Sequence, residues 1–256
     1  MFNKTFMNEI FSKEKCGFTL AEVLITLGII GVVAVMTIPT LLANIRGNQY
    51  RSSFKKAISI LSQTARMSQA QYGFDYSGID TTCGANASTE DPEQVHSICA
   101  LMNGTLSGAT YFANATDIAV TKNNKTEPYS YQKGPFFSKF ENRDVSYFRA
   151  YTLRDGTIIG IYKFLGRNSC SMTVGTEMSD APDDEMAFCV GFIDVNGVNP
   201  PNKEVSCSRG SDSLSQKTCI VKNDAQHMAD VFPIRFHDGV VEPASAAGRY
   251  ILRTAK

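Results

Sequence analysis

Residues 18–42 read FTLAEVLITLGIIGVVAVMTIPTLL, and no charged side chain occurs between Val23 and Leu42. A helix of these last twenty residues would be about 30 Å long, which is the thickness of the hydrocarbon core of a bilayer. In a secretory signal peptide the apolar run is shorter, and a small residue at the cleavage site follows it. Here the small residue, Gly17, precedes the run. We therefore expect residues 18–42 to form a membrane-spanning helix that stays with the mature chain.

Glu22 lies at the edge of this apolar run. A charged group at the centre of a membrane helix costs about 2.5–3.5 kcal/mol, and it usually has a functional partner. Cleavage between Gly17 and Phe18 would create such a partner, because the new α-amino group is positively charged. In a stacked assembly, Glu22 of one subunit would then pair with the terminal amine of a neighbour. A second interpretation, compatible with the first, is an interfacial Glu that the dipole of a helix N-terminus stabilises.

The stretch KCGFTLAEVL, residues 15–24, resembles the prepilin peptidase site of type IV pilins and type II secretion pseudopilins. That family has a short charged leader, a Gly before the cut, an N-methylated Phe after it and a Glu five residues past the cut. Gly17, Phe18 and Glu22 match these positions. Pro39 matches the proline that interrupts the helix in that family, and we expect it to kink or loosen the helix locally.

The resemblance implies that a prepilin peptidase removes residues 1–17 as a leader peptide and that Phe18 is then N-methylated. It also implies that residues 18–42 form the core of a filament, either a type IV pilus or a secretion pseudopilus. The partners would be homologous pilin-like subunits and an inner-membrane assembly platform. The alternative function is a membrane-anchored adhesin or binding module that uses the same export signal and does not polymerise.

The resemblance and the cysteine count together indicate a single-pass protein of a bacterial inner membrane. Its N-terminus would lie in the cytoplasm and its head in the periplasm or outside the cell. The charges flanking the span do not set this orientation, because the basic residues after it outnumber the lysines before it. The basic residues after the span are Arg46, Arg51, Lys55 and Lys56.

The helix is expected to continue through residues 43–75 as an amphipathic second half. Apolar or small residues recur there at spacings of three and four, and charged residues occupy the other faces. Gly73 and the polar segment 75–80 predict its end. The apolar stripe consists of Phe54, Ala57, Ile58, Leu61, Ala65, Ser68 and Tyr72.

The seven cysteines become six if Cys16 leaves with the leader. In an oxidising compartment six cysteines can form three disulfides, with 15 connectivities. None of them forms a CxxC pair, which argues against a zinc ribbon or a thioredoxin motif. We favour sequential pairing of Cys83 with Cys99, Cys170 with Cys189, and Cys207 with Cys219.

Residues 76–256 are predicted to form an extracytoplasmic globular head. Residues 83–145 look irregular apart from a short helix expected at His96–Met102. Farther along the chain, β-branched and aromatic residues flank Asp-Gly turns. The pattern predicts an antiparallel sheet packed on the second half of the helix, an α+β, pilin-like fold. The expected strands are 147–153 and 157–164 as a hairpin, 187–195, 231–236 and 240–242 as a second hairpin, and Tyr250–Arg253 closing the sheet.

Asp194 and Asn196 belong to an Asp-Val-Asn-Gly string that resembles the opening of a calcium loop. Asp212 and Asp224 add oxygens of the hardness that Ca²⁺ prefers, and some pseudopilins bind calcium in the C-terminal loop. No Glu completes an EF-hand, so a type I′ turn is the favoured interpretation. No other cofactor is expected.

Catalysis has little support in the sequence, and we predict no enzymatic activity. The three histidines, His96, His227 and His237, belong to no HExxH or nucleophile motif. An anchored envelope enzyme would need a deep cleft with converging titratable groups. The chain has 25 basic and 25 acidic residues. This balance provides no strongly basic surface for nucleic acid, although a local basic patch stays open.

Overall fold

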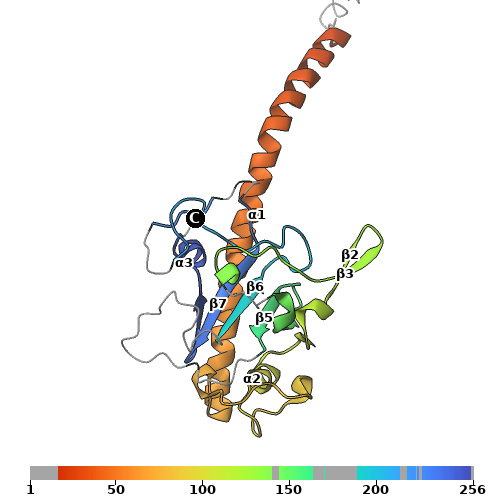
Figure 1. The fold of residues 1–256 in the computed structure, drawn as a ribbon. Helices are drawn as coiled ribbons and strands as arrows, with labels where there is room; N and C mark the ends of the chain where they lie inside the picture. The colour runs from red at the N-terminus through yellow and green to blue at the C-terminus, as the bar shows by residue number, and fades with distance from the viewer. Residues whose placement is uncertain are drawn as a thin grey trace, which may run out of the picture. The chain divides into compact units, whose positions relative to one another are not determined.

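The computed structural model describes residues 17–139, 144–163, 170, 189–213, 218–222, 224 and 227–254. The rest of the predicted leader and the first residues of the predicted strand 187–195 lie outside these ranges. Two compact units can be separated, Met1–Leu42 and Ala43–Lys256. The helix α1 (Leu20–Tyr72) contributes its first half to one unit and its second half to the other (Figure 1).

The first half of α1 exposes its apolar side chains. Between Phe18 and Leu42 the large apolar residues are 44% to 88% exposed. An 18-residue window of α1 reaches a mean hydropathy of 2.3 with none of it buried, so its length and composition suffice to cross a membrane. The helix continues through Pro39. On either side of this proline, the hydroxyls of Thr37 and Thr40 donate to backbone carbonyls one turn earlier.

The second half of α1 buries the predicted stripe. Phe54 and Leu61 are completely buried, and the Phe54 ring stacks on Phe232 of the sheet with 4.1 Å between ring centroids. The helix ends at Tyr72, and Gly73 adopts the left-handed conformation with φ of 83°, which a residue other than glycine seldom takes at a helix end. Both the stripe and the predicted stop are confirmed.

Six strands form one antiparallel sheet in the order β1-β4-β5-β6-β7-β8; β5, β6 and β7 of this sheet are labelled in Figure 1. Asp155-Gly156 joins β4 to β5 and Asp238-Gly239 joins β7 to β8, as the sequence predicted. The strands are β1 (Thr110–Phe112), β4 (Phe148–Thr152), β5 (Ile158–Tyr162), β6 (Val190–Asp194), β7 (Val231–His237) and β8 (Val240–Pro243). A separate hairpin consists of β2 (Ala119–Lys122) and β3 (Lys125–Pro128).

Apolar side chains cover both faces of this sheet, because successive residues of a strand point to opposite sides. On β5, Ile159 and Ile161 belong to the cluster that contains Phe54 and Leu61 of α1. The alternate residue Ile158 belongs to a second cluster, formed with residues 115–137 and 145–148. A long N-terminal helix packed against an antiparallel sheet confirms the predicted α+β, pilin-like architecture.

The shorter elements correct two predictions. Tyr250–Arg253 is not a strand but lies in α3 (Ala246–Arg253), which begins where Ser245 Oγ accepts from the Gly248 backbone N–H at 3.2 Å. Within residues 83–145 the expected short helix His96–Met102 is present as α2 (Ile98–Thr105), but the strands β1–β3 were not predicted there. Short 3₁₀ turns complete the head: η1 (Tyr76–Gly78), η2 (Ala87–Thr89), η3 (Ala115–Asp117), η4 (Phe137–Lys139) and η5 (Val145–Tyr147).

Three disulfides join the six cysteines of the head in the sequential pattern. They link residues 16, 19 and 12 positions apart, namely Cys83–Cys99, Cys170–Cys189 and Cys207–Cys219. Crosslinks that close loops of this size each stabilise a fold by about 3 kcal/mol in the chain-entropy account.

Candidate functional site

The start of α1 is organised by Thr19 and Glu22. Glu22 Oε2 accepts hydrogen bonds from the Thr19 backbone N–H and from its hydroxyl, both at 2.8 Å. In return, Thr19 Oγ1 accepts from the Glu22 backbone N–H at 3.2 Å. This reciprocal pair is a capping box, with Thr19 as the N-cap and Glu22 as the third helical residue. It satisfies backbone N–H groups that a helix start would otherwise leave unpaired.

This capping box was not predicted, although Thr-x-x-Glu is its signature. The structure therefore agrees with the second interpretation of Glu22, a carboxylate at a helix N-terminus. Pairing with the amine of a neighbouring subunit stays a prediction. Both hydrogen bonds from Thr19 end on Oε2, and a carboxylate accepts at both of its oxygens. The two roles of Glu22 are therefore compatible.

The predicted cleavage site lies just before the helix. Gly17 and Phe18 precede the first helical residue, and Phe18 is 88% exposed. A Cβ built on Gly17 would meet no atom within 4 Å. Exposed, non-helical backbone is where proteases cut most readily, so the geometry is compatible with cleavage at Gly17–Phe18.

The predicted calcium loop contains a buried acid. Asp194 has no exposed surface; its Oδ1 accepts from the Asn196 backbone N–H at 3.0 Å and its Oδ2 from the Tyr129 hydroxyl at 2.6 Å. Burial, and then the negative charge of Asp230, raises the pKa of Asp194 to about 8. Burial also raises the pKa of Asp230, whose carboxylate accepts from the Asn202 backbone N–H at 3.1 Å.

The turn after Asp194 is not the predicted type I′ turn. That turn needs positive φ at both central residues, but only Gly197 has it here, with φ of 64°, and Asn196 does not. The loop also does not lead directly into the next strand, because 36 residues separate the ends of β6 and β7, at Asp194 and Val231.

Asp212 and Asp224 have partners other than Asp194. Asp212 Oδ1 accepts from the Cys207 backbone N–H at 2.9 Å, and an Asp224 oxygen lies 2.5 Å from the ring of His227. Within the described ranges, the clusters of three His, Cys, Asp or Glu ligand atoms are Cys83–Glu90–Cys99 and Cys207–Asp212–Cys219. Calcium binding at Asp194 and Asn196 stays a prediction.

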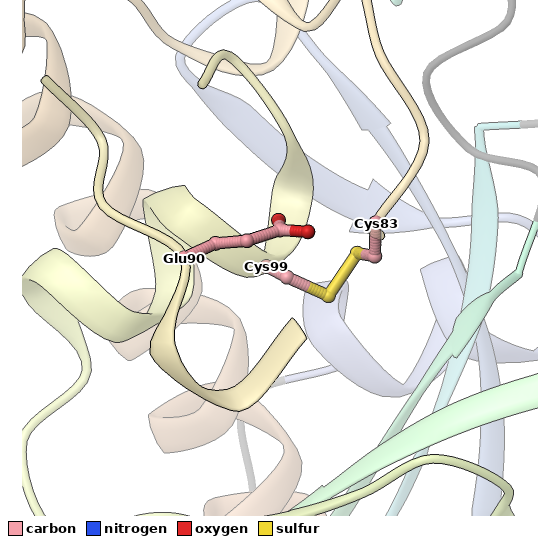
Figure 2. A group of neighbouring side chains, drawn as sticks. All are labelled: Cys83, Glu90 and Cys99. Atoms are coloured by element: carbon pink, nitrogen blue, oxygen red, sulfur yellow. A yellow bond between two sulfur atoms is a disulfide. The ribbon is translucent and has the colours of Figure 1, made fainter. Parts of the chain in front are cut away.

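Figure 2 shows the first of these clusters, in which the two sulfur atoms are bonded to each other. A disulfide offers no thiolate to a metal ion. Glu90 instead accepts hydrogen bonds from the Gly84 backbone N–H and the Ser97 hydroxyl. The second cluster contains the Cys207–Cys219 disulfide. Both clusters therefore stabilise loops of the head.

The three histidines contact different acidic groups and form no common constellation. His96 lies 3.9 Å from Asp80 and stacks on Phe74. His237 contacts Asp238 and Glu242, and the hydrogen bond with Glu242 raises the pKa of His237.

One pocket of the Ala43–Lys256 unit is lined in part by His227, whose ring lies 2.5 Å from an Asp224 oxygen. The pocket is lined by Gly47, Tyr50, Arg51, Val205, Val221, Lys222, His227, Met228, Ala229, Phe232 and Ile251.

Residues 12–38 match a known family, the prokaryotic N-terminal methylation motif. The matched residues include Gly17, Phe18 and Glu22, and the match supports the type IV pilin-like and pseudopilin family inferred from the sequence. That family is structural rather than enzymatic. Together with the apolar half of α1, the motif fits a single-pass, membrane-anchored protein. No curated protein matches the chain, and no solved structure does.

Proposed function

We propose that this chain is a structural subunit of a pilus-like or pseudopilus filament, cut after Gly17 by a prepilin peptidase and N-methylated at Phe18. The observation that carries the proposal is the exposure of every large apolar side chain between Phe18 and Leu42. An apolar surface of this extent marks a site of contact with lipid or protein. The methylation motif at residues 12–38 supports the same pathway.

In this proposal the first half of α1 contacts lipid before assembly and contacts the same segment of neighbouring subunits in the filament. Lipid tails are as apolar as leucine, so helices associate in a bilayer through close packing instead of through exclusion of water. Gly28 and Gly31 are three residues apart, and a Cβ built on either would meet no atom within 4 Å. These positions leave room for a neighbouring helix to approach closely.

Glu22 would set the axial register of the filament. Its Oε2 is occupied by the Thr19 cap, and Oε1 would accept from the α-amino group of a neighbouring Phe18. In a low-dielectric surrounding such a pair is strong, and an unpaired charge is costly. A subunit misplaced along the axis would lose the pair, so the correct position is favoured.

Two substitutions of Glu22 distinguish its role in the capping box from the role of its negative charge. Glu22→Gln keeps a side-chain oxygen that can complete the capping box but removes the negative charge, whereas Glu22→Ala removes both. If pairing with the amine sets the register, both variants insert into the membrane and both lose filament assembly. The measurement is the yield of sheared filaments from the bacterium that makes the protein, with membrane-bound subunit as the reference.

The same strains decide between the filament and the non-polymerising alternative. A Glu22→Gln variant with normal filament yield would overturn the pairing of Glu22 with the amine, and a loss confined to Glu22→Ala would assign the effect to the cap. A cysteine introduced at exposed Ile30 should crosslink neighbouring subunits in whole envelopes under oxidation. A ladder of crosslinked subunits supports the filament. If the chain with a cysteine at position 30 and no other change yields only monomers under oxidation, the membrane-anchored adhesin or binding module is favoured.

A further inference from the structure

Lys163, Asn114 and Asp117 meet at the edge of the second hydrophobic cluster. Asn114 precedes η3, whose first residue Ala115 is completely buried in that cluster, and Lys163 directly follows β5. The backbone N–H of Lys163 donates to the Tyr147 carbonyl at 2.9 Å, which fixes the start of its side chain. These three side chains therefore come from well-anchored segments 49 residues apart in sequence.

The lysine amine contacts the oxygen of the asparagine amide. Lys163 Nζ donates a hydrogen bond to Asn114 Oδ1 at 2.5 Å. A carbonyl bond is about 1.2 Å long, so Nζ is at most about 3.7 Å from the carbonyl carbon, close to the distance of a near-attack geometry.

Asp117 holds the other end of the same amide. Its Oδ2 accepts from Asn114 Nδ2 at 2.8 Å and from the Asn114 backbone N–H at 3.0 Å. The amide is therefore oriented with its oxygen toward the lysine and its nitrogen on a carboxylate. An aminolysis requires an amine, an amide carbon and a group that protonates the departing nitrogen. Asp117 contacts that nitrogen, and it can give it a proton once it has taken up the proton that the amine loses.

We propose that Lys163 and Asn114 form an intramolecular amide bond, with Asp117 as the group that transfers the proton. The uncharged amine attacks Cγ of Asn114, the bond from Cγ to Nδ2 breaks, and Nδ2 leaves as ammonia. Nζ loses one proton and the departing Nδ2 gains one, both through the Asp117 carboxylate. Atoms and charges balance, and the step needs no oxidant, metal or cofactor.

The surroundings of Lys163 favour the uncharged form of its amine, which is the nucleophilic form. Burial first, and then the positive charge of Arg149, lowers the pKa of Lys163, while Asp117 and Asp144 act in the opposite direction.

The bond would also crosslink a part of the head in which no disulfide closes a loop. All three disulfides lie outside residues 100–169, whereas this bond would join the segment after β1 to the end of β5.

The test is mass spectrometry of the full chain, extracted from membranes in detergent and reduced. The mature protein should be lighter by one ammonia than its sequence and N-methylation require. Trypsin should fail to cleave after Lys163, and should release one branched peptide that joins residues 67–122 to residues 155–167. Separate, unmodified peptides ending at Lys122 and Lys163 would overturn the proposal. Loss of ammonia without the branched peptide, as in succinimide formation at an asparagine, would overturn it as well.

Three variants test the assigned roles. Lys163→Arg keeps the positive charge but lacks the amine, and Asp117→Asn keeps the shape but lacks the carboxylate, so both should lose the branched peptide. Lys125→Arg, the same change at an exposed lysine of β3, should retain it. Near-ultraviolet circular dichroism and the absence of free thiols show that each variant is folded. Persistence of the branched peptide in Lys163→Arg would contradict the assignment. This test does not depend on filament assembly.

Discussion

The first half of α1 is more apolar than the second half, yet it is the second half that is buried. Leu27 in the first half is 60% exposed, whereas Leu61 in the second half has no exposed surface. The difference lies in what each half can contact within one chain. The sheet and the disulfide-linked loops cover the second half. The apolar surface of the first half is left for lipid or for other subunits.

The largest expected effect comes from the same substitution made in each half. Leu61→Ala should lower the free energy of unfolding of the head by about 2–5 kcal/mol, because it leaves a cavity in a closely packed core. Leu27→Ala removes no contact within the head and should change that free energy by less than about 0.5 kcal/mol. Denaturant unfolding in detergent, followed by near-ultraviolet circular dichroism, measures both. Equal destabilisation by the two variants would contradict the conclusion that only the second half of α1 is packed in the core of the head.

A smaller effect concerns pH. Asp194 has a pKa of about 8 in the folded head and about 3.9 in an unfolded chain. Between these values the folded state holds a proton that the unfolded state has lost. The free energy of unfolding should therefore fall as pH rises from about 4 to about 8, by up to about 1.4 kcal/mol per unit.

Asp194→Asn isolates this contribution, because an amide keeps an oxygen for the Asn196 N–H but does not titrate. Glu204, whose pKa burial raises to about 7, has the same sign and is present in both proteins. The stability of the variant should therefore depend less steeply on pH than that of the wild type. Parallel pH profiles would show that Asp194 is charged in the folded head. The profiles should be the same in detergent and in lipid if the head is self-contained.

The smallest expected effect concerns an ion pair between α1 and the β4–β5 turn. Lys56 Nζ lies 2.8 Å from Asp155 Oδ2, and both side chains are well exposed to solvent. Such pairs contribute about 0.2–1 kcal/mol. Asp155 also accepts from the Thr157 backbone N–H, so a double-mutant cycle with Lys56→Ala and Asp155→Ala is needed. A coupling energy well above this range would mean that charge, and not burial, docks the second half of α1.

Long or strongly patterned segments were predictable from the sequence. The apolar run and the stripe from Phe54 to Tyr72 extend over many helical turns, so the period is unambiguous. Asp155-Gly156 and Asp238-Gly239 identify two hairpins because this turn chemistry is local. Short segments were not predictable in the same way. Four residues at Tyr250–Arg253 do not distinguish the period of a strand from that of a helix, and the Ser245 cap decides in favour of α3.

The residues of the candidate sites were likewise predictable only where they are close together in sequence. Gly17, Phe18 and Glu22 were found because their spacing is a motif of adjacent residues. The cluster of Lys163, Asn114 and Asp117 has no such signature, since Lys163 is 49 residues from Asn114 in sequence and the strands β2 to β5 lie between them. The buried state of Asp194 was also missed, because its partner Tyr129 is distant in sequence.

The sequence by itself determined the membrane-length helix, the processing motif, the amphipathic stripe and the Asp-Gly hairpins. Each of these depends on interactions between residues that are near one another along the chain. Only the tertiary structure decided which half of α1 is covered and which acidic side chains are buried. It also decided that the Phe192 ring lies over Gly160 of β5, where a Cβ would collide with it. Those outcomes depend on contacts between distant segments, and a linear pattern does not encode which surfaces meet.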